Sequence, residues 1–261
     1  MKVQDLGELA GEVVLFGGVV SNLQALDALV AEVGDRPAIC TGDVVAYCGD
    51  PSACVTRMRA LGWPVVAGNV EQQIGLDADD CGCGFGDGTA CDVKSAKWYA
   101  HARAALDADA RDWAAACPER LVFTHHGRRW AGLHGGATSI NRFLWPTSPD
   151  EAFGEEISAL RQQVGAIDGV IAGHSGVPFT RRIDGVEWVN AGSIGMPPHY
   201  GCPETHYAVL GPKGAAIRLL AYDVDAAVAA MQAAGLTQGH ETTLQTGWWP
   251  SEDVLPPDLR R

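Results

Sequence analysis

The stretch Ile39-Cys40-Thr41-Gly42-Asp43 joins a short run of β-forming residues to a sharp turn that ends in a carboxylate. The same arrangement recurs at residues 64–69, 130–134 and 170–174, which end in Asn69, His134 and His174. Because the strand ends of one sheet converge, such loops can build one site from residues far apart in sequence. One carboxylate, one amide oxygen and two imidazoles suit a divalent transition metal. Alone, Asp43 would be read as a turn residue, but in register with three similar loops it is predicted to be a ligand.

The segments around these loops alternate between strand and helix patterns. In the first half, strands are expected at residues 12–17, 38–41 and 63–67, and helices at 22–33, 51–61, 95–106 and 108–116. The second half is richer in β structure: hairpins are expected over 121–133, 177–190 and 206–222, a strand over 169–172, and helices over 148–164 and 224–234. This order predicts an α/β protein in which two mixed sheets pack together with helices outside.

Three further stretches carry a family resemblance. They are Phe16 to Leu26 (F-G-G-V-V-S-N-L-Q-A-L), Gly42 to Tyr47 followed by Asp50-Pro51, and Val189 to Gly195 (V-N-A-G-S-I-G). Together with the four loops and their order, they make the chain resemble the calcineurin-like metallophosphoesterases, especially the small bacterial phosphodiesterase-like branch. The resemblance covers roughly residues 12–222 and implies a four-layer α/β/β/α sandwich of two mixed β-sheets flanked by helices. We expect one domain over residues 1–261, with a Cys/Gly-rich insert at 75–92 and a C-terminal helix and tail at 223–261.

The chain departs from the family at several positions that carry chemistry. The family's first motif, D-x-H, is replaced by Gly18-Val19-Val20, so two ligands of one metal are missing. A histidine that contacts the transferring phosphate is replaced by Val70, and the last histidine of G-H-x-H by Gly176. In the family, the position of Asp43 bridges two metals, and those of Asn69, His134 and His174 complete the shell of the second metal. The resemblance therefore implies one divalent ion (zinc, manganese, iron or nickel) instead of two.

Three functions follow from these residues. The first is a metal-dependent phosphoesterase with a degenerate, mononuclear site, acting on a phosphomonoester or phosphodiester of a small phosphorylated molecule. The second is a catalytically inactive protein that keeps the fold for binding or regulation. Loss of the two-metal clamp, which holds both the attacking and the leaving oxygen, makes this second function a serious alternative. Possible contacts to the substrate are Asn141, Arg142, His199 and Tyr200, whereas His125 and His126 at a predicted hairpin turn are expected to be exposed.

The third function is a thiol-metal or redox protein built on the insert. The chain has eight cysteines, and Cys81, Cys83 and Cys91 lie in a stretch rich in glycine and aspartate. Thiolates bind zinc and iron well, so these three and Cys48, five residues after Asp43, are possible additional ligands. The alternative is that they are reduced thiols in a glycine-rich surface loop, because C-x-C followed by a third cysteine eight residues on is no familiar zinc spacing. Cys40, Cys54 and Cys117 occupy apolar positions and are predicted to be core thiols.

Composition narrows the class of partner and the location. There are 32 acidic and 19 basic residues, a net charge of -13, which disfavours nucleic acid because a phosphate backbone needs a basic face. The polar start of the chain does not resemble a signal peptide, and no apolar stretch approaches a membrane span. We therefore expect a cytoplasmic protein with no membrane partner. The sequence leaves the oligomeric state open.

Overall fold

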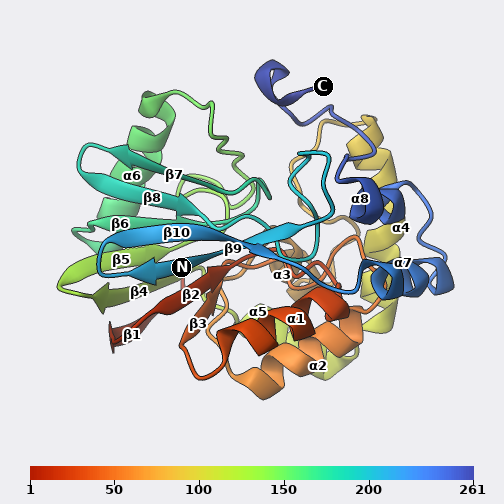
Figure 1. The fold of residues 1–261 in the computed structure, drawn as a ribbon, viewed down its shortest axis with the longest axis horizontal. Coiled ribbons are helices and arrows are strands. Elements are labelled where there is room, and N and C mark those ends of the chain that lie inside the picture. The colour runs from red at the N-terminus through yellow and green to blue at the C-terminus, as the bar shows by residue number, and fades with distance from the viewer.

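The computed structural model describes all residues from 1 to 261 and contains two mixed β-sheets with helices on both outer sides (Figure 1). This confirms the predicted four-layer α/β/β/α architecture. The six-stranded sheet has the order β1-β4-β5-β6-β8-β7, and the four-stranded sheet has the order β10-β9-β2-β3. The strands are β1 (Val3–Leu9), β2 (Val13–Phe16), β3 (Ala38–Cys40), β4 (Arg120–His125), β5 (Arg128–Gly132), β6 (Gly169–Ala172), β7 (Phe179–Ile183), β8 (Val186–Asn190), β9 (Thr205–Gly211) and β10 (Gly214–Leu220).

The helices begin and end at residues whose chemistry suits those positions. Asn22 caps α1 by accepting a hydrogen bond from the Ala25 N–H, and Pro51 opens α2, where its missing N–H has no cost. Gly62 ends α2 in the left-handed region at φ 63°. The helices are α1 (Leu23–Val33), α2 (Pro51–Leu61), α3 (Asn69–Gly75), α4 (Ala90–Ala105), α5 (Ala108–Ala116), α6 (Asp150–Val164), α7 (Val224–Ala233) and α8 (His240–Thr246), with a 3-10 turn at Pro257–Leu259.

Alternation of side chains along the strands produces three apolar layers. Val13 and Leu15 of β2 point between the sheets, where they join Trp130 of the larger sheet in a fully buried cluster. Val14 and Phe16 point the other way, into the layer shared with α1, α2, α4, α5 and α7. Helix α6 covers the opposite outer face, where Phe153 packs edge-on against Trp188 at 5.3 Å between ring centroids. The three layers hold the sheets in fixed register and so fix the positions of the loops at their ends.

The metal-competent loops leave the sheets at one common edge. Strands β2 and β3 run parallel in one sheet, and β5, β6 and β8 run parallel in the other, so within each sheet their carboxyl ends lie on the same side. The Asp43 loop follows β3, the His134 loop follows β5, and the His174 loop follows β6. This is the convergence of strand ends that the sequence predicted.

Several local predictions were wrong. The expected strand at 63–67 forms only one isolated bridge, between Val65 and Cys40. His125 is buried at 2% exposure, because its Nε2 donates a hydrogen bond to the Gly11 carbonyl oxygen at 2.8 Å. Strand β1 and helix α8 were not anticipated at all.

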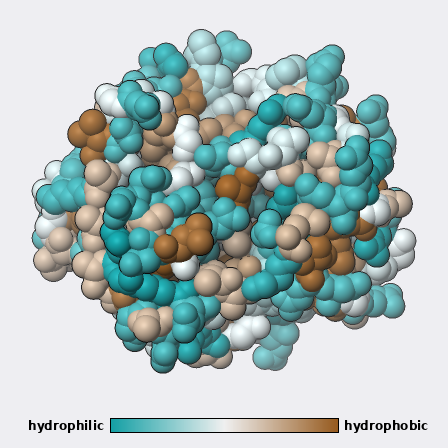
Figure 2. Space-filling view, turned by 180° about the vertical axis from the view of Figure 1, so that it is seen from behind, coloured by the Kyte–Doolittle hydropathy of each residue, from teal (hydrophilic) through white to brown (hydrophobic).

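Hydrophilic residues cover much of the molecular face drawn in Figure 2. Figure 2 shows hydrophobic groups in small separate patches on the face seen from behind. The exposed large hydrophobic side chains are scattered along the chain: Met1, Val3, Leu76, Val93, Tyr200 and Leu219. None of the helices is both long enough and apolar enough to span a membrane.

Candidate metal centre

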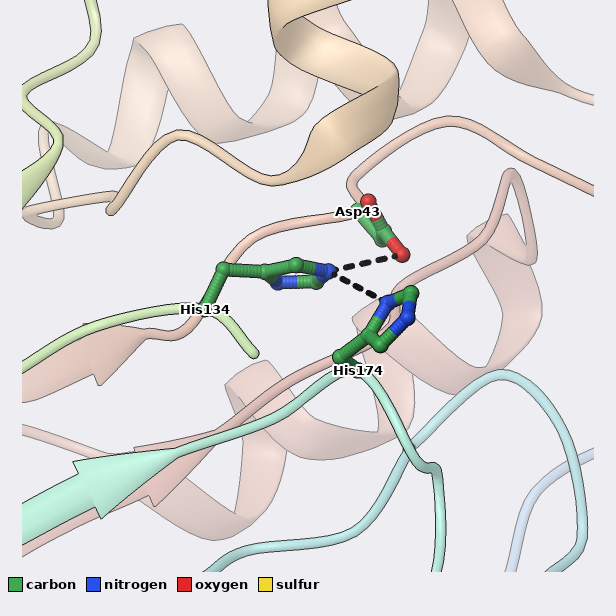
Figure 3. Close-up of side chains that lie close together, drawn as sticks. All are labelled: Asp43, His134 and His174. Atoms are coloured by element: carbon green, nitrogen blue, oxygen red, sulfur yellow. Dashed lines mark hydrogen bonds and ion pairs between the residues drawn. The ribbon is translucent and has the colours of Figure 1, made fainter. Parts of the chain in front are cut away.

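Asp43, His134 and His174 meet at the common edge of the two sheets (Figure 3). His134 is central: its Nε2 lies 3.2 Å from Asp43 Oδ2 and 3.1 Å from His174 Nδ1. Asn69 completes the group, with its Oδ1 also 3.1 Å from His134 Nε2. The structure therefore brings together the four residues that the sequence singled out as ligands. It contains no other cluster of three or more histidine, cysteine or acidic side chains close enough to hold a metal.

The orientation of His134 is set by a hydrogen bond on its far side. Its Nδ1 lies 2.6 Å from the Thr41 carbonyl oxygen, so Nδ1 carries the proton and donates it. In the neutral ring, Nε2 then presents its lone pair to Asp43, Asn69 and His174. Backbone support of this kind is typical of metal-binding histidines. A cation placed between these electron-rich atoms would satisfy all of them, so the residues present fit a divalent metal.

The local electrostatics keep Asp43 and His174 in the protonation states that bind a metal. Burial raises the pKa of Asp43, but the facing His134 outweighs it and holds the pKa of that carboxyl below its ordinary value. Burial lowers the pKa of His134, whereas the Asp43 carboxylate raises it, and the net direction is upward. Burial together with the neighbouring His134 lowers the pKa of His174 to about 3. At neutral pH, Asp43 is therefore charged and His174 neutral, and His134 would release a proton on binding a divalent metal.

The ligand-bearing loops hold a strained backbone. Asp43 has φ 55° and His174 has φ 62°, both in the left-handed region that most side chains avoid. Gly42 stands at φ 97°, and a Cβ there would come within 2.9 Å of three backbone atoms of residues 66 and 68. The loop that carries Asp43 and the loop that carries Gly68 thus approach each other more closely than a side chain at Gly42 would allow. Strain of this kind is common at functional sites, where the surrounding structure enforces it.

A buried carboxylate that sequence reasoning missed joins two of the loops. Glu71 of α3 is 1% exposed and accepts three hydrogen bonds of 2.8 Å, from the N–H groups of Asp43, Val44 and Gly68. Burial, reinforced by the charge of Asp43, raises the pKa of Glu71 above its ordinary value. Its position three residues after Gly68 is the spacing of a capping box, and this signal could have identified it.

The side of Asp43 away from this shell holds no second set of ligands. Gly18 faces Ser193, whose Oγ would lie 2.6 Å from a Cβ at that position, and Val20 is buried at 3% exposure. A Cβ on Gly176 would lie 3.8 Å from Cζ2 of Trp249, so an indole from the C-terminal tail stands beside this position. Apolar and small groups thus occupy the region where further ligands would have to lie.

A pocket with a cavity volume of about 90 Å³ opens to solvent beside the three ligands. Its walls are largely apolar or aromatic and include Phe85, Phe143, Met196 and Trp249, and its single cationic side chain is that of Lys94. The Phe143 ring lies 4.2 Å from the His174 ring, centroid to centroid. The pocket therefore suits a ligand with an apolar part and little negative charge beyond what one metal and one lysine can offset.

The four residues considered as substrate contacts do not line this pocket. The Asn141 amide donates to the Gly82 carbonyl oxygen at 3.1 Å, and Arg142 pairs with Glu155 and Glu156. His199 holds the tail: it accepts from the Trp249 N–H at 2.8 Å and contacts Glu252 at 2.9 Å. Tyr200 is half exposed on the surface. The substrate contacts expected at these four positions therefore stay predictions.

The cysteines separate into three groups. Cys40 and Cys54 are buried core thiols and Cys117 is half-buried against the same core, as their apolar positions predicted. Cys48 is also buried, with its Sγ 3.8 Å from the Gly195 carbonyl oxygen, and it does not reach the pocket. Cys83 and Cys91 line the pocket, and Cys83 forms a disulfide with Cys81.

Comparison with known protein families identifies a match over most of the chain. The family model described as the calcineurin-like phosphoesterase superfamily domain matches residues 18–213. The chain therefore belongs to the calcineurin-like phosphoesterase superfamily.

Solved structures share the fold at low sequence identity. A metallophosphoesterase from Sphaerobacter thermophilus is 20% identical, with a TM-score of 0.72 over 91% of this chain and 99% of that one. A hypothetical protein from Pyrococcus horikoshii OT3 is 16% identical, with a TM-score of 0.74 over 90% of this chain and 98% of that one. A comparison with curated protein sequences finds no match.

Proposed function

We propose that the chain is a phosphoesterase that hydrolyses a phosphomonoester or phosphodiester of a small molecule at a single divalent metal ion. The observation that carries this proposal is the convergence of Asp43, Asn69, His134 and His174 around one point. Membership of the superfamily supports the reaction class. The absence of any second ligand cluster supports a mononuclear site.

A divalent ion bound there would supply Lewis acidity, polarising a phosphoryl oxygen and lowering the pKa of a bound water. The chain's own residues orient this site. Thr41 fixes the His134 tautomer, and Glu71 fixes the Asp43 loop. Lys94 places one positive charge on the pocket wall, where it can attract an anionic oxygen of the substrate.

The leaving group receives little help from the protein. Val70 is fully buried and cannot donate a proton where the family has a histidine. Loss of a general acid lowers rates by roughly 10²–10⁴ when the leaving group is a poor one. The proposed enzyme therefore favours esters of acidic alcohols, such as aryl phosphates, over alkyl phosphates.

The test is metal reconstitution followed by a hydrolysis assay. Protein stripped of metal is loaded with zinc, manganese, iron(II) or nickel and given bis(p-nitrophenyl) phosphate or p-nitrophenyl phosphate. His134→Ala is the site variant. His126→Asn is the matched control, because His126 is an exposed histidine at a left-handed turn position that asparagine tolerates. We expect turnover with at least one metal, lost by about 100-fold or more in His134→Ala and kept in His126→Asn.

The competing function is binding or regulation without turnover. It is favoured by Gly18, Val20 and Gly176, which stand where the family has metal-binding side chains. Absence of hydrolysis with every metal and both substrates, in protein that still binds metal, would replace the first function with this one.

A further inference from the structure

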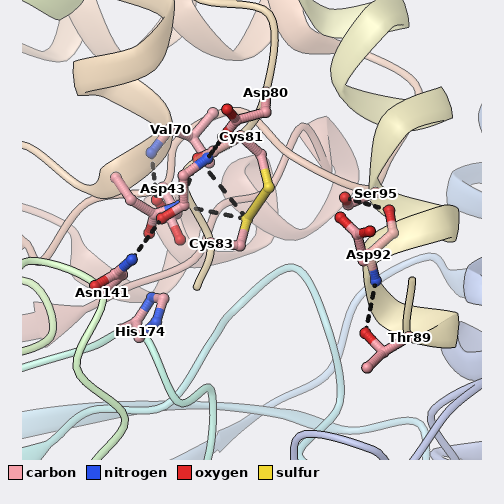
Figure 4. The surroundings of a disulfide bond; sticks show 12 residues. Asp43, Val70, Asp80, Cys81, Cys83, Thr89, Asp92, Ser95, Asn141 and His174 are labelled. Atoms are coloured by element: carbon pink, nitrogen blue, oxygen red, sulfur yellow. Dashed lines mark hydrogen bonds between the residues drawn. A yellow bond between two sulfur atoms is a disulfide. The ribbon is translucent and has the colours of Figure 1, made fainter. Parts of the chain in front are cut away.

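The Cys81–Cys83 disulfide lies directly beside the metal shell (Figure 4). The Asn69 side chain connects the two features: its Oδ1 faces His134, while its Nδ2 lies 3.4 Å from Cys83 Sγ. Cys83 also lines the pocket together with Asp43, His134 and His174. The Asn69 side chain thus lies between the Cys83 sulfur and His134 of the proposed metal site.

The insert that carries the disulfide is held firmly over the site. Asn69 Nδ2 donates to the Cys81 carbonyl oxygen at 2.8 Å, and Asn141 Nδ2 donates to the Gly82 carbonyl oxygen at 3.1 Å. Gly82 and Gly84 have φ 62° and 77°, and a Cβ on either would come within 2.9 Å of Gln73 or Asn141. This packing leaves side-chain rotation as the main freedom of Cys83 once its bond to Cys81 is broken. A change of χ1 rotamer moves a cysteine sulfur by about 3 Å.

We propose that the Cys81–Cys83 pair is a redox-controlled ligand of the metal site: reduction frees Cys83, whose sulfur then binds the ion held by Asp43, His134 and His174. A small dithiol is the reductant. Its two thiols pass two electrons and two protons to the S–S bond, giving two cysteine thiols and leaving the reductant as a disulfide. On binding the metal, the Cys83 thiol releases its proton to solvent. Cys83 is chosen over Cys81 because it faces both the pocket and the Asn69 amide.

The proposal rests on the proposed function, because it needs a metal at that site, and it adds a sulfur to a shell of nitrogens and oxygens. A thiolate shifts the preference of a site toward thiophilic ions such as zinc. The oxidised protein would hold its metal through nitrogen and oxygen atoms alone. The reduced protein would hold it more tightly.

The test uses Co²⁺, whose absorption spectrum reports its ligands independently of activity. Metal-free wild type is titrated with Co²⁺ in oxidised form and after reduction and removal of the dithiol. We expect visible cobalt bands in both states. We also expect a thiolate-to-cobalt charge-transfer band in the near ultraviolet after reduction only, with a Kd at least about tenfold lower.

Variants assign the sulfur. Cys81→Ser leaves Cys83 free and is expected to show the charge-transfer band without a reductant, whereas Cys83→Ser is expected never to show it. Cys91→Ser is the matched control, since Cys91 also lines the pocket but forms no disulfide, and it should behave as wild type. His174→Ala should weaken the visible bands and the charge-transfer band together, because both arise from one ion.

Two results would overturn the proposal in distinguishable ways. Visible cobalt bands without a charge-transfer band, in both reduced wild type and Cys81→Ser, would refute the sulfur ligand and leave the proposed metal site intact. Absence of cobalt bands in every form would refute the metal site and the sulfur ligand together.

Discussion

Replacing Glu71 with alanine should destabilise the protein by about 3 kcal/mol or more, and it leaves every proposed metal ligand in the sequence. The carboxylate accepts hydrogen bonds from the N–H groups of Asp43, Val44 and Gly68, each at 2.8 Å. In Glu71→Ala these three N–H donors lose their acceptor at a buried place in the protein. Each unsatisfied buried donor costs about 1–3 kcal/mol of unfolding free energy. Entry of water into the space left by the side chain would bring the cost toward the lower end.

Two further variants separate geometry from charge. Glu71→Gln keeps one acceptor oxygen and removes the repulsion with Asp43, so it should cost only about 1–2 kcal/mol. Glu155→Ala removes an exposed carboxylate that pairs with Arg142 and should cost less than about 1 kcal/mol.

The assay is urea unfolding, followed by circular dichroism, in the presence of a chelator so that metal binding does not contribute. A second readout is the affinity for Mn²⁺ or Zn²⁺, which should fall in Glu71→Ala because the Asp43 and Asn69 loops lose their common anchor. A loss of unfolding free energy below about 1 kcal/mol in Glu71→Ala would refute the inference that this carboxylate joins the two loops.

Three other predictions test separate parts of the structure. Gly42→Ala should lower the unfolding free energy by about 3 kcal/mol, and Gly62→Ala by about 1–2 kcal/mol. Both glycines have a left-handed backbone, but a Cβ at Gly42 would also meet the Gly68 loop, whereas a Cβ at Gly62 would meet open space. Equal losses in the two variants would contradict the close contact between the loops. Burial and the nearby Lys94 lower the pKa of His240 to about 4, so the unfolded chain binds a proton at a higher pH than the folded chain does. The free energy of unfolding should therefore fall as pH drops from about 6.5 to about 4, by up to about 1.4 kcal/mol per pH unit. Urea unfolding of His240→Gln should show a weaker dependence of this free energy on pH, and an unchanged dependence would contradict the role given to His240. His199→Ala removes the contacts of His199 to Trp249 and Glu252 in the C-terminal tail. Chymotrypsin should then cleave near Trp248 roughly tenfold faster than in the wild type. Cleavage at the wild-type rate would show that other contacts hold the tail.

Much of the fold could be predicted because local pattern and tertiary role agree. Strand β6 at Gly169–Ala172 and helix α2 at Pro51–Leu61 match their predicted bounds, since each has an apolar pattern and clear end signals. Strand β1 was missed because Val3–Leu9 is polar and mostly exposed, so only its pairing with β4 makes it a strand. The segment at 63–67 has strand composition but lies at the sheet margin, where it gains a single bridge.

The candidate site shows the same division. The ligand loops were visible because glycine and one polar residue directly follow each strand pattern. The capping-box spacing from Gly68 could have identified Glu71. Its link to Asp43 and Val44 was not visible, because these partners lie 28 and 27 residues away and are backbone groups that any sequence supplies. His199 and Asn141 were considered as substrate contacts because His199 follows a turn that faces the metal edge in the family and Asn141 follows the His134 loop. The tail and the insert, whose paths the sequence did not specify, take up their hydrogen bonds instead.

The metal content of the purified protein tests the central claim most directly. Protein loaded with Mn²⁺ or Zn²⁺, freed of excess ion and measured by mass spectrometry of the elements should contain about one ion per chain, and His174→Ala should lose most of it. Two ions per wild-type chain, or one ion that is unchanged in His174→Ala, would contradict a single site built from Asp43, Asn69, His134 and His174.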